Sequence, residues 1–462
     1  MHLPELTLDF DKAIGKIKPL NGGNLAPPLA YSNLMDISQP FKELRMPYTR
    51  LHDAPLDNPG WRIVDFNMIF PFMQLDADDP QNYFFKQTDE YISHCLELGT
   101  KVIYRLGPSV EHHRPRYDMR AVLERQWDKW ARVAVNIIRH YNEGWGNGFH
   151  FNIKYWEIWA EPEAMWDMTL DEVRRIAGLP PNAPVPPKLE LDCVLGNFNQ
   201  FYCHVAQIIK NSCPNIKIGG PAHVRIDANG ASGGFLKCCS EHHAPLDFYS
   251  WHCYTDNIEF MRDQIPYARA LVDSYGYTKT ELHLNEWHYV PGSWSRVKPE
   301  KKHFMYEYKM KHLDAAAFNT AVLNVWQDTP LDVACYYTAT CMSFGLFSAH
   351  GVPTKSYYAM KAFGMMADYA ERIEVTANDR DLYPLAGRNA NGDCALLCSV
   401  FHVRGNSVYL KTTRPSAKVT LLNINEDQDL ESTETKFLPD GRIELPIATK
   451  PSVFLAIITP GN

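Results

Sequence analysis

Two glutamates, Glu161 and Glu286, have the types of neighbours expected of reactive carboxyl groups. Each follows a short apolar run and lies beside tryptophan, the first in the run WAEP and the second in the run NEWH. Two carboxyl groups that face each other can cleave a glycosidic bond. One protonates the leaving oxygen, and the other attacks or stabilises the positively charged sugar carbon. That chemistry requires a fold that brings residues 125 positions apart to one place.

The chain between about residues 20 and 370 alternates apolar runs with amphipathic stretches, which predicts strands alternating with helices. We expect strands at 47–53, 101–107, 152–162, 215–220, 246–254, 281–290 and 333–341, with 22–28 leading into the first. We expect helices near 87–99, 120–144, 197–211, 258–274, 301–326 and 354–370. This pattern predicts a parallel α/β sheet closed as a (β/α)8 TIM barrel. Active-site residues of such barrels lie at the C-terminal strand ends, where the fourth and seventh strands would deliver the two glutamates.

The last part of the chain has a different character. Short runs such as CALLCSVF and SVFLAIITP are separated by Gly, Asn, Asp and Pro, without a helical period. We therefore predict a barrel over 16–371 and a small C-terminal antiparallel β-sandwich over 372–462, joined by an N-terminal strand within 1–15. That strand would hold the two ends of the chain together.

Composition narrows the classes of partner. Across 462 residues, 45% are hydrophobic and 22% charged, as in ordinary globular proteins. The formal net charge of −8 argues against nucleic-acid and anionic-membrane partners, and no run of about 18 apolar residues predicts a membrane span. The aromatic content of 12% suits a sugar ligand, because apolar sugar faces pack on aromatic rings. A homo-oligomer is left open.

Cysteine usage bears on metals and on location. The 11 cysteines include no C-x-x-C pair, so the zinc and thioredoxin patterns are absent, and we expect no metal and no cofactor. An odd number of scattered thiols fits reduced cysteines in the cytoplasm. The N-terminus lacks the basic and apolar regions of a signal peptide, which favours the same compartment.

Five segments carry a resemblance to a known family. The segment YWEIWAEPE resembles the acid/base segment of clan A glycoside hydrolases, and HLNEWH resembles their nucleophile segment. The segments TRLHD, DFYSWHCY and FGLFSAHGVPTKSYYAMKAF resemble those of glycoside hydrolase family 39, which contains β-xylosidases and α-L-iduronidases. Together they cover the predicted barrel from end to end in the correct order.

The resemblance implies roles for individual residues. Glu161 would be the general acid/base and Glu286 the nucleophile of a retaining double displacement, with carboxyl groups about 5–5.5 Å apart. Tyr254 would lie beside the nucleophile and orient it. The other substrate-binding candidates are Arg50, His52 and His252 for sugar hydroxyls or a carboxylate, Asp53 and Arg105, and Trp287 and Tyr337 as apolar walls of the pocket. An ion pair would explain Asp53 and Arg105 equally, and the histidines and aromatic residues could equally be structural.

One position departs from the family. Ala160 stands where clan A enzymes have an asparagine, whose side chain binds the sugar 2-hydroxyl. The alanine could be engineered to slow turnover, or natural with a rebuilt pocket, or the mark of a weakened homologue.

We therefore expect a retaining glycoside hydrolase, exo-acting on a plant or microbial oligosaccharide and xylosidase-, arabinosidase- or uronidase-like. A carbohydrate-binding homologue with weakened catalysis is the first alternative. A metal-dependent barrel hydrolase or isomerase, with ligands among His52, Asp53, His252 and His288, is the second. It is disfavoured because the first strand has no His-x-His pair.

Overall fold

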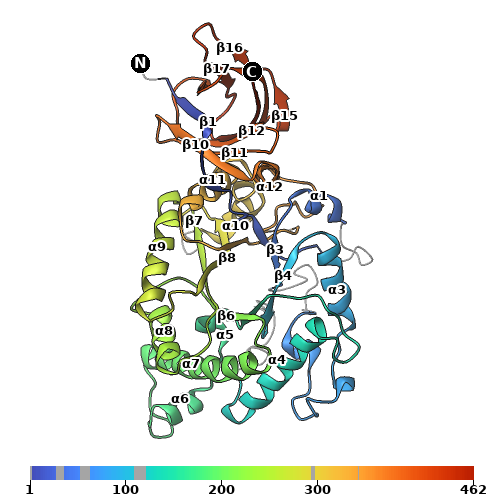
Figure 1. Cartoon of the computed structure of the whole chain (residues 1–462). Helices are drawn as coiled ribbons and strands as arrows, with labels where there is room; N and C mark the ends of the chain where they lie inside the picture. Colours follow the sequence, from blue (N-terminus) through green and yellow to red (C-terminus); the bar gives the residue numbers. More distant parts are fainter. Residues whose placement is uncertain are drawn as a thin grey trace.

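The computed structural model describes residues 3–27, 36–51, 63–108, 121–292, 297–341 and 343–461. Figure 1 shows a ring of strands with helices outside it and a second, strand-rich layer at one end, where both chain termini lie. The predicted (β/α)8 barrel with a C-terminal β-sandwich is confirmed. No helix within the described residues is long and apolar enough to cross a membrane.

Eight parallel strands close the barrel in chain order, and the first pairs with the last. They are β2 (Gly22–Asn24), β3 (Tyr48–Arg50), β4 (Lys101–Leu106), β5 (Tyr155–Ile158), β6 (Lys217–His223), β7 (Phe248–Thr255), β8 (Glu281–Tyr289) and β9 (Val333–Tyr336). Their side chains alternate between the barrel interior and the surrounding helices.

Helices surround the barrel. They are α1 (Ser38–Glu43), α2 (Phe66–Ile69), α3 (Lys86–Glu97), α4 (Trp127–Asn142), α5 (Pro162–Met165), α6 (Leu170–Ile176), α7 (Pro187–Ser212), α8 (Ala231–Glu241), α9 (Ile258–Ser274), α10 (Pro299–Phe304), α11 (Leu313–Val325) and α12 (Lys355–Met365). Short helical turns lie at η1 (Pro80–Asn82), η3 (Glu124–Gln126), η5 (Met305–Lys309), η6 (Trp326–Asp328) and η7 (Met366–Tyr369).

Several helices differ from the sequence prediction: α1, α2, α5 and α6 were not predicted, and α7 begins at Pro187 and not near residue 197. The single helix expected at 301–326 is wrong: it is divided into α10, the π-helical turn η5 and α11, with His312 extended before α11 begins. Helix α8 was not predicted because its glycines have low helix propensity. Gly233 is required there, since a Cβ would lie 1.9 Å from the carbonyl oxygen of Ala228.

A curled ten-stranded sheet forms the second layer. It contains β1 (Glu5–Lys16), β10 (Glu371–Ala377), β11 (Leu382–Arg388), β12 (Cys394–Val400), β13 (Ser407–Thr412), β14 (Ser416–Ile424), β15 (Asp429–Thr433), β16 (Lys436–Phe437), β17 (Ile443–Pro446) and β18 (Ser452–Pro460). Strand β1 pairs antiparallel with β10 and parallel with β13, so the N-terminal strand lies inside the C-terminal sheet.

Helix α11 joins the two layers. Nearly all its side chains are buried, as expected of a helix that is apolar on every side. Ser399 on β12 donates a hydrogen bond to the carbonyl of Ala317 (2.7 Å), and Asn324 donates one to the carbonyl of Tyr383 (2.8 Å). The sheet therefore packs against the barrel as part of one continuous core.

The barrel interior is layered. An apolar cluster fills the end where the strands begin and contains Ile103, Tyr155, Phe248, Val333 and Cys335. Two residues further along the strands, the inward positions become polar, as at Glu157 and Ser250. The apolar layer closes one end, and the polar layer is the floor of the candidate site at the other.

Candidate active site

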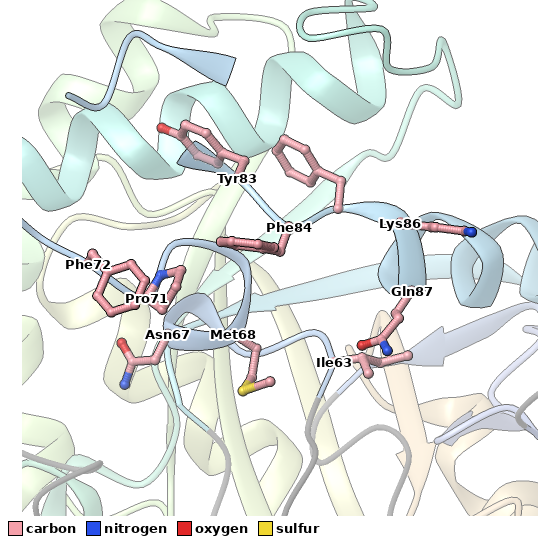
Figure 2. Close-up of a pocket in the computed structure, with 10 residues that line it drawn as sticks. Ile63, Asn67, Met68, Pro71, Phe72, Tyr83, Phe84, Lys86 and Gln87 are labelled. Atoms are coloured by element: carbon pink, nitrogen blue, oxygen red, sulfur yellow. The ribbon is translucent and has the colours of Figure 1, made fainter. Parts of the chain in front are cut away.

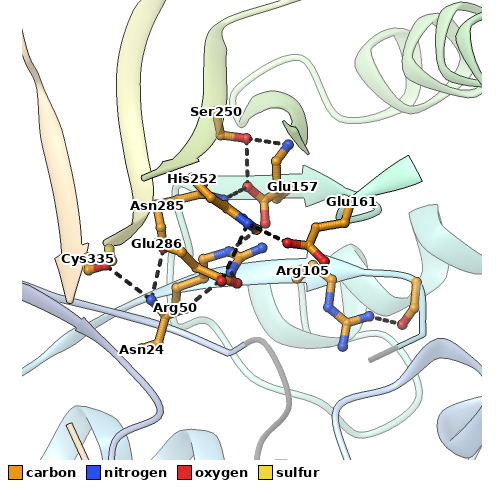
Figure 3. A network of polar contacts seen from close by, with 12 residues as sticks. Asn24, Arg50, Arg105, Glu157, Glu161, Ser250, His252, Asn285, Glu286 and Cys335 are labelled. Carbon is orange, nitrogen blue, oxygen red and sulfur yellow. Dashed lines mark hydrogen bonds and ion pairs between the residues drawn. The ribbon is translucent and has the colours of Figure 1, made fainter. Parts of the chain in front are cut away.

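A buried arginine bridges two carboxylates at the floor of the site (Figure 3). Arg50 ends β3, and its Nε lies 2.6 Å from Oε2 of Glu157 on β5. Its Nη1 lies 2.7 Å from Oε1 of Glu286 on β8. The side chains are 0%, 0% and 6% exposed, respectively. Burial alone would lower the pKa of Arg50, but the two carboxylates outweigh it and raise the pKa, so the guanidinium is charged.

The other oxygen of Glu157 is held by two donors. Ser250 Oγ donates to Glu157 Oε1 over 2.8 Å, and the amide of Asn285 donates to the same oxygen. Asn24 accepts from Arg50 Nη1 (3.2 Å) and donates to the backbone carbonyl of Asn285 (2.8 Å). Five strands thus share one polar network, which restrains Arg50 and, through it, Glu286.

Glu161 and Glu286 face each other above this floor. His252 Nδ1 lies 2.8 Å from Oε1 of Glu161 and 3.4 Å from Oε2 of Glu286. One oxygen of each carboxyl group and a ring nitrogen of His252 all lie within 4.8 Å of one another. Tyr254 donates its hydroxyl to Oε2 of Glu286 over 2.7 Å. The residues come from the ends of β5, β7 and β8, so the barrel brings the two glutamates to one mouth.

The backbone at Glu161 is in an uncommon conformation. Its φ of +42° and ψ of +58° are left-handed, and Trp159 has a φ of +67°. Such conformations cost about 1–3 kcal/mol each and persist only where surrounding contacts enforce them. The N–H of Glu161 donates to the carbonyl of Ala222 (3.0 Å), and Pro162 begins α5. The strained turn directs the carboxyl group of Glu161 toward His252.

A β-bulge places Asn285 and Glu286 on the same side of β8. Trp251 of β7 is in register with Leu284, but the next residue, His252, is in register with Glu286. Asn285 is the extra residue, and a bulge re-aims the side chains around it. Consecutive residues therefore both point into the barrel, which simple alternation would forbid.

Trp287 then points outward. It has no exposed surface and packs edge-on against Trp326 (5.0 Å) and Tyr336 (5.1 Å). The expectation that Trp287 forms a wall of the sugar pocket is not supported, because the residue after an inward-facing glutamate faces the helices. Tyr337 is partly exposed, with its ring edge-on to Tyr254 at 6.5 Å.

The neighbours of His252 raise its pKa. Burial opposes its protonation, but the charge of Glu286 and the hydrogen bond to Glu161 outweigh burial and raise its pKa. Its Nε2 has no hydrogen-bond partner among the described residues. Nδ1 of His252 therefore contacts both glutamates, and Nε2 is available to bind a ligand.

A second histidine–carboxylate pair, not predicted from the sequence, lies beside Glu161. His223, at the end of β6, lies 2.8 Å from Glu163 through its Nδ1, and His223 Nε2 and Glu163 Oε2 are buried without partners in the described part of the chain. Burial opposes ionisation of Glu163, but His223 outweighs it and lowers the pKa of Glu163. Two glutamates that were not predicted as site residues, Glu157 and Glu163, could have been found in the sequence. Glu157 is a charged residue within the apolar run YWEI, and Glu163 follows Glu161 by two positions.

The remaining candidates separate into three cases. Arg105 is buried and pairs with Asp65 (2.7 Å), so an ion pair accounts for it. His52 and Asp53 lie outside the described residues. Ala160 is fully buried directly before Glu161.

Both ring nitrogens of His288 are hydrogen-bonded within the barrel wall. Its Nδ1–H donates to the carbonyl of Tyr289 (2.7 Å), and its Nε2 accepts from the hydroxyl of Tyr336 (2.6 Å). Burial lowers its pKa to about 4, so the ring is neutral at pH 7. His288 therefore has no nitrogen left for a metal. Glu161, His252 and Glu286 are close enough to hold a cation, but an ion there would occupy both carboxylates.

An apolar pocket of about 630 Å³ lies apart from these glutamates, in the segment after β3. Figure 2 shows Ile63, Met68, Phe72 and Phe84 around it. Phe72 and Phe84 are 50% and 61% exposed. Among the described residues, no carboxyl group lines this pocket, so the paired glutamates, and not the pocket, define the candidate active site.

A closed barrel with two carboxyl groups at the C-terminal strand ends is an arrangement that can cleave a glycosidic bond. The profile of "Glycosyl hydrolases family 39" matches residues 189–392. A β-xylosidase of Caldicellulosiruptor saccharolyticus is 22% identical over 423 residues, covering 81% of this chain and 74% of the relative. A β-xylosidase of Geobacillus stearothermophilus is 20% identical over 354 residues, covering 70% of this chain and 62% of that relative.

Solved structures share the fold. A glucosidase from Croceicoccus marinus has a TM-score of 0.74 at 21% identity, with complete coverage of both chains. The GH39 enzyme from Xanthomonas axonopodis pv. citri has a TM-score of 0.66 at 14% identity, covering 100% of this chain and 98% of that one. The family match and the named relatives make the chain similar to glycoside hydrolase family 39 and support a glycosidase acting on carbohydrate.

Proposed function

We propose that this protein is a retaining exo-glycosidase in which Glu286 is the nucleophile and Glu161 the general acid/base. The observation that carries the proposal is the approach of the two carboxyl groups, whose nearest oxygens lie within 4.8 Å. That spacing agrees with the roughly 5–5.5 Å between carboxyl groups of retaining enzymes and is shorter than the roughly 6.5–9.5 Å of inverting ones.

The surroundings of each glutamate suit its proposed role. Glu286 is 6% exposed and receives hydrogen bonds from Arg50 and Tyr254, which orient its carboxylate for attack. Glu161 is 22% exposed, so it can reach a leaving group and, later, a water molecule. His252 contacts both and holds Glu161 toward the reacting bond.

The reaction would take two displacements. The carboxylate of Glu286 attacks the anomeric carbon while the bond to the leaving oxygen breaks and that oxygen takes the proton of Glu161. Glu161, now a carboxylate, removes a proton from water, which attacks the glycosyl–enzyme ester and regenerates Glu286. The released sugar keeps its anomeric configuration.

We propose terminal β-D-xylosides as the first substrate class, because both named relatives are β-xylosidases. Arabinosides, glucosides and uronides are the competing classes. A panel of aryl glycosides ranks them by kcat/KM, and NMR of the first anomer released tests retention. Release of the inverted anomer would exclude the double displacement.

Azide rescue assigns the two glutamates. Glu286→Gly should lose at least about 10³-fold in kcat, and azide should yield a glycosyl azide of inverted configuration. Glu161→Ala with an activated aryl glycoside should yield the azide of retained configuration. Glu281→Gln is the matched control, since Glu281 lies on β8 at the opposite end of the barrel. Full activity in the Glu286→Gly variant, or binding of sugar by the unaltered protein without turnover, would contradict the proposal.

A further inference from the structure

Helices α7 and α8 bring two thiols and an imidazole together on the outside of the barrel. Cys203 Sγ on α7 lies 3.8 Å from Cys238 Sγ on α8, and Cys238 Sγ lies 3.7 Å from Nδ1 of His242. All three atoms lie within 4.8 Å of one another. All 11 cysteines are free thiols, and a sulfur–sulfur distance of 3.8 Å is far longer than the roughly 2.05 Å of a disulfide.

We propose that Cys203, Cys238 and His242 form a binding site for Zn²⁺ or a chemically similar cation, with solvent as the fourth ligand. Tetrahedral zinc binds thiolate sulfur at about 2.3 Å and imidazole nitrogen at about 2.0–2.1 Å. Those bond lengths require sulfur–sulfur and sulfur–nitrogen separations of about 3.8 and 3.6 Å. Two of the three ligand separations, 3.8 Å between the sulfurs and 3.7 Å between Cys238 Sγ and His242 Nδ1, match those of a tetrahedral site. The third, between Cys203 and His242, is within 4.8 Å, so small side-chain movements would complete the site.

The sequence hides this site because the ligands come from two helices. Cys238 and His242 are one helical turn apart at the end of α8, so they lie on the same face. Cys203 is 35 positions earlier and meets them only because α7 packs against α8. Cys203 is buried, Cys238 is half-buried and His242 is exposed, so the site is anchored on one side and open to solvent on the other.

Binding would exchange protons for the cation. The hydrogen bond to Cys203 and burial raise the pKa of the Cys238 thiol, so Cys238 is protonated when no metal is bound. Two thiols would each release one proton, and His242 would bind as the neutral ring. Nδ1 of His242 now lies 2.9 Å from the carbonyl oxygen of Cys238, so its proton must move to Nε2 before Nδ1 can donate to a cation. Two thiolates then balance the charge of one divalent ion.

The position of the site indicates a structural role. Helix α8 ends just before β7 begins, so His242 lies toward the barrel end opposite the glutamates. A cation there would cross-link two neighbouring helices far from the proposed reaction. We expect Zn²⁺ at about 100-fold its Kd to raise Tm by about 3 °C while kcat is unchanged.

Titration of the reduced, metal-stripped full chain with Co²⁺ tests the proposal. The expected result is one Co²⁺ per chain, a thiolate-to-cobalt charge-transfer band, and its loss on adding one equivalent of Zn²⁺. Cobalt bound by Glu161, His252 and Glu286 would lack that band, because those donors contain no sulfur.

Three variants localise the band. Cys238→Ser and His242→Ala should each weaken binding at least about 10-fold, and the fold should tolerate both, because Cys238 is only half-buried and His242 is exposed. Cys193→Ser, on the same α7 helix, should leave the band intact. No charge-transfer band with the unaltered chain, or an undiminished band in Cys238→Ser, would overturn the site.

Discussion

Replacement of Arg50 by methionine removes the positive charge shared by Glu157 and Glu286. The guanidinium lies 2.6 and 2.7 Å from their oxygens, and none of the three side chains is more than 6% exposed. At an effective dielectric constant of about 20, charges about 4 Å apart attract by about 4 kcal/mol.

The expected loss in unfolding free energy is therefore about 3–5 kcal/mol, the range for breaking a buried ion pair. Adding Glu157→Gln to Arg50→Met should restore part of that loss, because the glutamine leaves no unpaired charge at position 157. The double-mutant cycle should show a coupling of at least about 2 kcal/mol. By contrast, Arg132→Met removes an exposed pair with Asp78 and should cost less than about 1 kcal/mol.

Urea unfolding at pH 7, followed by tryptophan fluorescence, measures Arg50→Met, Glu157→Gln, their double variant and Arg132→Met against the unaltered chain. The activity of Arg50→Met should fall together with its stability, because Glu286 loses its partner. A loss below about 1 kcal/mol in Arg50→Met, or strictly additive effects in the cycle, would refute the shared-charge reasoning.

Three further outcomes are expected. Tyr254→Phe removes a charge-assisted hydrogen bond to Glu286 worth about 1.5–3 kcal/mol, so kcat/KM for an aryl glycoside should fall about 10–100-fold with little change in Tm. Ala160→Asn should raise kcat/KM about 10-fold if the amide reaches the sugar 2-hydroxyl, and an unchanged or lower value would mean that the pocket is built around alanine. The pKa of His288 is lowered from 6.5 to about 4 in the folded state, so the unfolded chain binds more protons in this window. The contribution of His288 to the unfolding free energy should therefore be fully present above pH 6.5 and fall by about 3 kcal/mol as the pH decreases to 4. Urea unfolding at a series of pH values should show a weaker pH dependence in His288→Gln.

The alternation of apolar runs with helical periods could be read from the sequence because strands and helices impose different side-chain periods. The same pattern predicted that Glu161 and Glu286 would share one mouth, since parallel strands in a barrel end on the same face. The helix at 301–326 could not be resolved this way. Both halves consist of residues that a helix accepts, so local propensity does not show that His312 is extended between the π-helical turn and α11.

Tertiary structure decided the details that chemistry depends on. The bulge at Asn285 turns Glu286 inward and Trp287 outward, and it depends on the pairing register between β7 and β8. The Arg50–Glu157 pair and the Cys203–Cys238 contact each join residues far apart in the chain. Local sequence determines which faces of each element are apolar, but only packing determines which polar atoms meet, because a hydrogen bond or ion pair requires separations accurate to a few tenths of an ångström.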